Sequence, residues 1–172
     1  MDVIEAIKKR RSIRKYNQSK KITDEQIEKL LDVAGLAPSA GNLQSWHFVV
    51  IKDSEIKSQI AQAANNQTFI ANADVVFVSC ADCKRSSSHY GERGKNLYSI
   101  QDATLASLNM WLCATSMGLG VCWVGAFDEK RVSEILSLSE NLRPVAILPL
   151  GYPAESPQAH PRRAIEKIST EL

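Results

Sequence analysis

Three arginines and a serine lie close together near the start of the chain, within the basic run Arg10–Tyr16. A guanidinium presents several N–H donors in a planar fork that matches a phosphate, and a neighbouring hydroxyl can add a further donor. The run therefore predicts an anion site. Its charge alone allows a phosphate group, a nucleic acid or plain solvation of a basic surface.

A second stretch with binding potential is Pro38–Trp46, which is rich in small, hydroxyl and amide side chains. Gly41 lets the backbone approach a ligand closely, and Asn42 and Gln44 can each donate and accept hydrogen bonds. The alternative is an ordinary connection between a helix and the following strand.

The distribution of charge bears on the class of partner. The 172-residue chain is 44% hydrophobic and has a formal net charge of +2, which argues against a nucleic-acid binder. Residues 1–21 nevertheless carry eight basic residues against Asp2 and Glu5, so the positive charge is concentrated at the N-terminus. This fits a local anion site or a solvated basic arm in a single globular domain.

The four cysteines are too few and too dispersed for a disulfide scaffold. Cys80 and Cys83 form a C-x-x-C pair, which allows a redox pair or half of a zinc site. Cys113 and Cys122 lie in apolar segments without a second such pair, so buried thiols are the preferred interpretation and no metal is expected. Reduced thiols, together with the lack of a signal peptide or an apolar run of about 18 residues, predict a cytoplasmic protein.

The elements that must position these residues alternate between helical and strand patterns. A short helix should end by Arg10 or Arg11, and Thr23–Gln26 reads as the capping box of a second helix that ends before Pro38. Further helices are expected over 54–64, 97–117 and 128–136, and strands over 47–51, 75–78, 120–125 and 143–150.

Two segments stand out from this pattern. Residues 82–96 are polar and without period, which predicts a surface loop or a mobile lid. Residues 97–117 are apolar on nearly every face, so the expected helix must be covered nearly all round, by the sheet of its own chain or by a second subunit.

Four motifs in order resemble the nitroreductase family of FMN-dependent oxidoreductases over essentially the whole chain. They are RRSIRKY at 10–16, PSAGNLQSW at 38–46, GLGVCWVGAF at 118–127 and GYP at 151–153 followed by PRR at 161–163. No GxGxxG, GxxxxGK[ST], GxSxG or HExxH motif competes with this interpretation.

The resemblance implies an α+β fold with a mixed central sheet flanked by helices, formed by residues 1–172 as one domain. It implies a homodimer with FMN at the subunit interface and a C-terminal tail, 152–172, that contributes to the flavin site or the dimer. NADH or NADPH would reduce the flavin, which would pass electrons to nitroaromatic, quinone or related small-molecule acceptors by a ping-pong cycle. No nucleic acid or membrane is expected as a partner.

The resemblance also assigns roles to individual positions. Arg10 and Ser12 would contact the phosphate or ribityl chain, and Arg14 would lie toward the pyrimidine edge, where a cation stabilises reduced flavin electrostatically. Arg11 also belongs to the first flavin-binding motif. Ser39, Ala40 and Asn42 match the loop offered by the partner subunit, and Gln67 falls where an amide often meets the flavin ring. Val124 and Gly125 match the strand end near flavin N5, and Arg162 and Arg163 match the C-terminal phosphate pair. No catalytic side chain is expected, because the flavin carries the chemistry.

Two other functions stay open at this point. One keeps the fold but performs reductive dehalogenation or a flavin-consuming reaction with another electron donor. The other is a basic-arm nucleic-acid binder, which would show a steep salt dependence.

Overall fold

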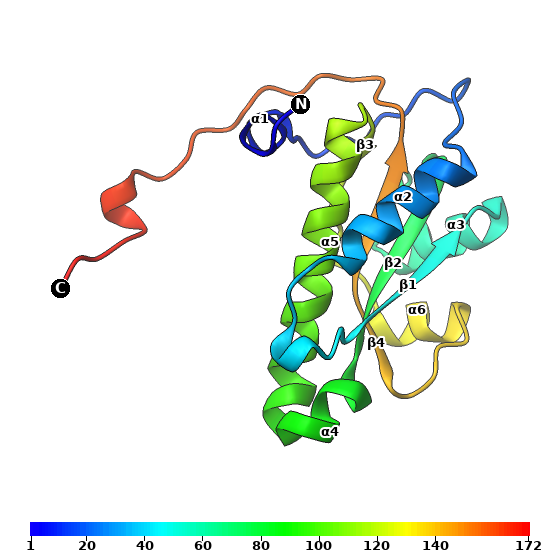
Figure 1. Ribbon diagram of the computed structural model, residues 1–172. Helices are drawn as coiled ribbons and strands as arrows, with labels where there is room; N and C mark the ends of the chain where they lie inside the picture. Colours follow the sequence, from blue (N-terminus) through cyan, green and yellow to red (C-terminus); the bar gives the residue numbers. More distant parts are fainter.

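The centre of the protein is a four-stranded sheet. The computed structural model describes residues 1–172, and its strands follow the order β1-β2-β4-β3 (Figure 1). All three strand pairs are antiparallel. The expected mixed character is limited to one isolated parallel bridge between Ser12 and Val121. The strands span Trp46–Ile51 (β1), Val75–Asp82 (β2), Gly120–Val121 (β3) and Leu142–Gly151 (β4).

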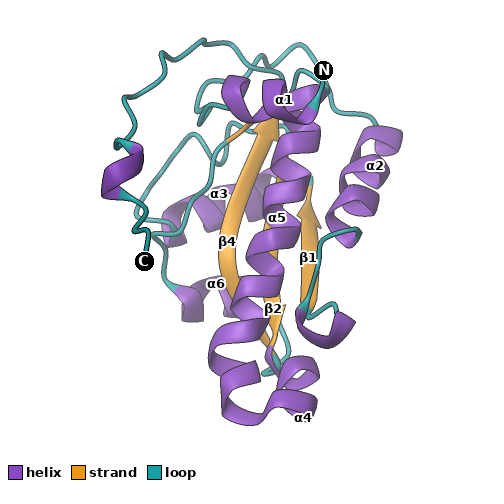
Figure 2. Ribbon diagram, turned by 60° about the vertical axis from the view of Figure 1, so that its left-hand side comes forward, coloured by secondary structure: helices purple, strands orange, loops and turns teal.

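Helices cover both faces of this sheet, which confirms the α+β architecture (Figure 2). The helices α2 (Asp24–Gly35) and α5 (Ser99–Ser116) pack on one face, and α3 (Ser54–Ala63) and α6 (Glu129–Ile135) pack on the other. Successive β2 residues alternate between the two cores: Val75 and Phe77 join the first, while Val76 and Val78 join the second. Burial of both faces explains why β2 reads as a continuous apolar run.

The helix boundaries follow from capping side chains. Asp2 accepts from the N–H of Glu5 at the start of α1 (Val3–Lys9), and Asp53 and Asp128 cap α3 and α6 in the same way. Thr23 and Gln26 form the predicted capping box of α2. The strand expected over 120–125 is shorter than predicted, because β3 ends at Val121 and Val124 makes only an isolated bridge to Ile147.

The prediction of an irregular loop over 82–96 is wrong. The segment forms α4 (Cys83–Arg93), capped by Asp82, and continues into a π-helical turn, η2 (Gly94–Tyr98). A helix that buries only Ser86 shows no apolar period, so its sequence resembles a loop. Edge-to-face packing of Tyr90 on Tyr98, with ring centroids 5.1 Å apart, holds the two pieces together.

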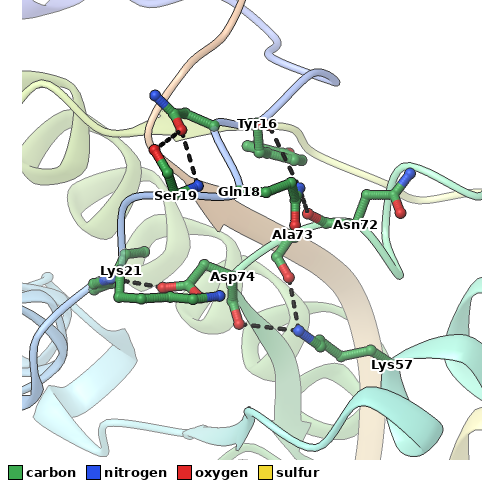
Figure 3. Close-up of polar contacts among 10 residues, drawn as sticks. Tyr16, Gln18, Ser19, Lys21, Lys57, Asn72, Ala73 and Asp74 are labelled. Atoms are coloured by element: carbon green, nitrogen blue, oxygen red, sulfur yellow. Dashed lines mark hydrogen bonds and ion pairs between the residues drawn. The ribbon is translucent and has the colours of Figure 1, made fainter.

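Polar contacts fix the chain that follows the first motif (Figure 3). Asp74 accepts from the N–H of Ile22 at 2.6 Å and pairs with the ammonium of Lys21 at 2.9 Å. The buried ammonium of Lys57 donates to the carbonyls of Ala73, at 2.7 Å, and Asp74, at 3.1 Å. Burial lowers the pKa of Lys57, and the nearby carboxylate of Asp74 opposes this shift. The loop before β2 thus anchors the N-terminal segment to the body of the protein.

The N-terminus and α1 lie near the C-terminal end of α5, whereas the C-terminal tail extends away from the body of the protein (Figure 1). Beyond Glu155 the tail is extended except for the short 3₁₀ turn η3 (Ile165–Lys167), and its apolar side chains Ile168 and Leu172 are exposed. On α5 itself, Leu105 and Leu108 are 40% and 43% exposed. The long apolar helix is therefore left partly uncovered by its own chain. No helix is both long enough and apolar enough to cross a membrane.

Candidate functional site

A polar cavity of about 420 Å³ lies between the first motif and the start of the C-terminal tail. Four side chains of the first motif face the tail across it. The lining residues are Arg10, Arg11, Ser12, Arg14, Glu155, Pro157, Gln158, Ala159, His160 and Arg162. The cavity therefore brings together two segments that are about 140 residues apart in the sequence.

Three guanidinium groups at this cavity lack an acceptor. The side chains of Arg10, Arg14 and Arg162 take part in none of the hydrogen bonds or ion pairs of the protein. Burial, followed by the charges of Arg162 and Arg11, lowers the pKa of Arg10. Arg11 differs, because its guanidinium donates to the carbonyls of Lys8, at 2.7 Å, and Arg10, at 2.8 Å. Four guanidiniums line the cavity against the single carboxylate of Glu155, and this excess of positive charge favours a bound anion.

The wall beside these arginines is formed by the segment that follows β3. Ile13 donates to the carbonyl of Val121 at 3.0 Å, which joins the first motif to the sheet edge. Both backbone polar groups of Val124 are paired with Ile147 at 2.9 Å, whereas the N–H of the exposed Gly125 has no partner in the chain. Of the two positions, Gly125 is therefore the one that can donate to a ligand from its backbone.

The loop after α3 is held against this wall. The side-chain amides of Asn65 and Gln67 both donate to the carbonyl of Ala126, at 3.2 and 3.3 Å. Phe69, farther along the same loop, lies under Arg14, with the guanidinium carbon 5.7 Å from the ring centroid. Gln67 uses its N–H groups within the chain and keeps its carbonyl oxygen as an acceptor.

Glu155 ties the tail to the first motif. Its carboxylate accepts from the backbone N–H groups of Arg14 and Lys15, at 3.0 Å for Lys15. The tail then continues past the cavity to Arg162, whereas Arg163 does not line the cavity and donates to the carbonyl of Lys167. Only the first residue of the predicted C-terminal arginine pair is thus placed with the other basic groups.

The predicted residues Ser39, Ala40 and Asn42 lie elsewhere. Their turn, η1 (Ala40–Asn42), packs near the N-terminal end of α5, where Ala40 donates to Asp102 at 3.0 Å. Arg10 lies instead beside Trp111, nine residues farther along α5, or about 13 Å at 1.5 Å per residue. Within one chain, the predicted residues of the 39–42 loop are therefore separated from the arginine-lined cavity.

The η1 loop has an unusual backbone that is held by one buried carboxylate. Gly41, Asn42 and Gln44 all have positive φ angles, of 58°, 55° and 53°. The Asp102 carboxylate, only 2% exposed, accepts from Ala40 and, at 2.8 Å, from the hydroxyl of Ser45. Strained segments persist only where surrounding contacts specify them, and Asp102 supplies these contacts at both ends of the loop.

Replacing Asp102 with alanine is expected to destabilise the protein by about 1–3 kcal/mol, because the buried hydroxyl of Ser45 and the half-buried N–H of Ala40 lose their acceptor. Asp102→Asn is the matched control, since its amide can still accept from Ala40 and donate to Ser45. Urea unfolding of both variants measures the difference. Equal stability of Asp102→Ala and Asp102→Asn would contradict the role assigned to these hydrogen bonds.

The cysteines do not form a reactive cluster. Burial raises the pKa of Cys80 to about 12, which disfavours the thiolate that redox or metal chemistry requires. Burial also raises the pKa of Cys122, which lies near Ser12 and Arg14. All four cysteines are unpaired, and no group of three or more His, Cys, Asp or Glu side chains is placed to hold a metal ion.

Four residues at or near the site were absent from the sequence-based predictions: Phe69, Asp102, Trp111 and Glu155. Asp102 carried a usable signal, because it is the only charged residue in the α5 sequence. The others carried none, since an aromatic residue in an apolar helix and a glutamate in a polar tail have ordinary structural explanations.

Comparisons with known proteins identify the family of the chain. The family model described as the nitroreductase family matches residues 7–82 and 63–152. A protein of Methanothermobacter thermautotrophicus, provisionally named NADH dehydrogenase/NAD(P)H nitroreductase, is 40% identical over 161 residues; the match covers 91% of this chain and 80% of the relative. FMN reductase (NADPH) of Bacillus subtilis is 30% identical over 174 residues, with 94% of this chain and 70% of that protein covered.

A solved structure extends the similarity to three dimensions. The NADPH:FMN oxidoreductase from Vibrio harveyi, complexed with NAD⁺, superimposes with a TM-score of 0.90 at 31% sequence identity. The match covers 98% of this chain and 76% of that one.

Proposed function

Because the chain belongs to the nitroreductase family, we propose that it binds FMN at the arginine-lined cavity and transfers electrons from NADH or NADPH to small-molecule acceptors. The chain is an enzyme of the NAD(P)H-dependent oxidoreductase class. The acceptors in this proposal are nitroaromatics, quinones or related compounds, and the two substrates react in turn by a ping-pong mechanism. The four free cysteines suit a reducing compartment, and the proposal includes a cytoplasmic location for the protein.

The observation that carries the proposal is the group of three guanidiniums without acceptors. Arg162 is close enough to Arg10 for its charge to contribute to the lowered pKa of Arg10, and both residues line the cavity with Ser12. A phosphate monoester would accept N–H donors from both arginines and offset their repulsion. In this assignment Arg10 and Arg162 bind the phosphate and Ser12 adds a hydroxyl, while Arg11 and Arg163, whose guanidiniums donate to nearby carbonyls, contribute mainly charge.

The wall beside the cavity suits an isoalloxazine ring. When bound, FMN supplies a hydride-accepting N5 atom and an edge, near N1 and O2, that becomes negative on reduction. Arg14 would place its charge toward that edge and favour the reduced form. The free N–H of Gly125, next to Val124, would donate at the N5 side, and the amide oxygen of Gln67 would accept from a ring N–H.

A homodimer completes the site in this proposal. Within one chain, Ser39, Ala40 and Asn42 lie about 13 Å from Arg10 along α5 and do not line the arginine cavity. The exposed leucines of α5, with the apolar residues of α1 and of the extended tail, offer a surface that a second copy would cover. The second copy would then bring its own 39–42 loop to the flavin.

Steady-state kinetics test the activity. Protein reconstituted with FMN should oxidise NADH or NADPH only when a nitroaromatic or quinone acceptor is present, apart from slow turnover with oxygen. Parallel lines in double-reciprocal plots at several acceptor concentrations are expected for the ping-pong mechanism. Intersecting lines would contradict the ping-pong mechanism, and no turnover with either nicotinamide would contradict the proposed donor.

A further inference from the structure

One aromatic residue of α5 contacts the arginine that the proposed function assigns to the phosphate. Trp111 is 8% exposed, and its ring centroid lies 4.6 Å from the guanidinium carbon of Arg10. A separation of this size is typical of a cation over the face of an aromatic ring, and tryptophan provides the strongest such attraction among the side chains.

The geometry leaves the hydrogen-bonding edge of Arg10 available. The five N–H donors of a guanidinium lie in its plane, and its two faces carry none. Trp111 therefore restrains Arg10 through a face that could not donate to a ligand. Because no acceptor in the chain competes for the donors of Arg10, the stacked side chain presents its donors for a bound anion.

The side chain of Trp111 has a polar group without a hydrogen-bond partner. Its indole Nε1 is buried and has no hydrogen-bond partner in the protein. A buried N–H without an acceptor is destabilising, and a phenylalanine at this position would avoid that cost. Within the chain, the contact with Arg10 is thus the polar interaction that the indole makes.

We propose that Trp111 is a positioning residue for the phosphate of the flavin, holding the Arg10 guanidinium in place before the cofactor arrives. The inference rests on the proposed function, because it takes Arg10 as a phosphate ligand. Restraining a flexible arginine in advance lowers the entropy lost on binding, so the effect should appear in affinity for the phosphorylated cofactor. The affinity for riboflavin, which lacks the phosphate, should not depend on Trp111.

Equilibrium titration of the full-length apoprotein with FMN and with riboflavin tests the proposal. Trp111→Met fills much of the volume without a ring and should weaken FMN binding about three- to tenfold, while riboflavin binding changes by less than about twofold. Trp111→Phe restores an aromatic face and should recover most of the FMN affinity. Phe48→Met is the matched control on β1, because Phe48 packs against the same core as Trp111, and it should leave the ratio of the two affinities unchanged.

A double-substitution cycle separates positioning from packing. If Trp111 acts through Arg10, Trp111→Met should have no further effect on FMN affinity when Arg10→Ala is already present. Equal weakening of FMN and riboflavin binding, or full additivity with Arg10→Ala, would overturn the inference while leaving the proposed function standing. Should Trp111→Met fail to fold, Trp111→Leu takes its place in both measurements.

The same titrations distinguish a failure of the proposed function. Wild-type protein that binds FMN no more tightly than riboflavin would refute the phosphate site and this inference together. Wild-type protein that prefers FMN, with a Trp111→Met variant that keeps the full preference, would refute the inference alone.

Discussion

Arg10→Ala is expected to weaken FMN binding by about 1.5–3 kcal/mol, or roughly 10- to 150-fold in the dissociation constant. The reason is the loss of a charge-assisted hydrogen bond to phosphate from a side chain whose N–H donors have no acceptor within the protein. The affinity for riboflavin should hardly change, because riboflavin lacks the phosphate. Fluorescence titration of the apoprotein with both compounds measures the effect.

Arg11→Ala is the matched control for this experiment. It removes the same charge from the neighbouring position, but the Arg11 guanidinium already donates to the carbonyls of Lys8 and Arg10. Its effect on FMN affinity should be smaller than that of Arg10→Ala and should decrease with added salt, as expected for a charge acting at a distance. If Arg11→Ala weakens FMN binding more than Arg10→Ala does, the phosphate ligand has been assigned to the wrong arginine.

The second large effect is expected on α5. A double variant, Leu105→Glu with Leu108→Glu, places two charges on the partly exposed face that a second copy would cover. Burying unpaired charges in an interface costs several kcal/mol, so the variant should be monomeric at concentrations where the wild-type chain is dimeric. Because the 39–42 loop would reach the flavin only from the partner, FMN binding should be lost with the dimer.

Light scattering and FMN content of the same samples test this expectation. Ser58→Glu on α3 is the control, because it adds a charge to an exposed helix position on the opposite face of the sheet. It should remain dimeric and bind FMN. A monomeric α5 variant with normal FMN affinity would show that one chain suffices for the site.

The elements that depend on local sequence signals were predictable. Thr23 and Gln26 predict the start of α2, and the burial of β2 on both faces follows from its continuous apolar run. The proximity of the first motif to the 118–127 motif was also predictable, because the family resemblance assigned both motifs to one cofactor. The structure brings them together through the pairing of Ile13 with Val121.

What could not be predicted depends on contacts between distant segments. The polar α4 helix is a separate case, because it buries only Ser86 and its sequence therefore has no apolar period to identify it. Asp102 acquires its role from a loop about 60 residues earlier in the chain, and Trp111 from an arginine about 100 residues earlier. Each of these side chains has an ordinary local explanation, which is why sequence patterns alone did not single it out.

The central claim is that this chain binds FMN and that a nicotinamide reduces it. Anaerobic titration of the FMN-reconstituted protein with NADH, and separately with NADPH, tests it most directly by following the visible absorbance of the flavin. We expect protein-bound FMN whose absorbance is bleached at about one equivalent of at least one nicotinamide, since each hydride carries the two electrons that one flavin accepts. Protein that retains no FMN, or bound FMN that neither nicotinamide bleaches but a chemical reductant does, would contradict the account.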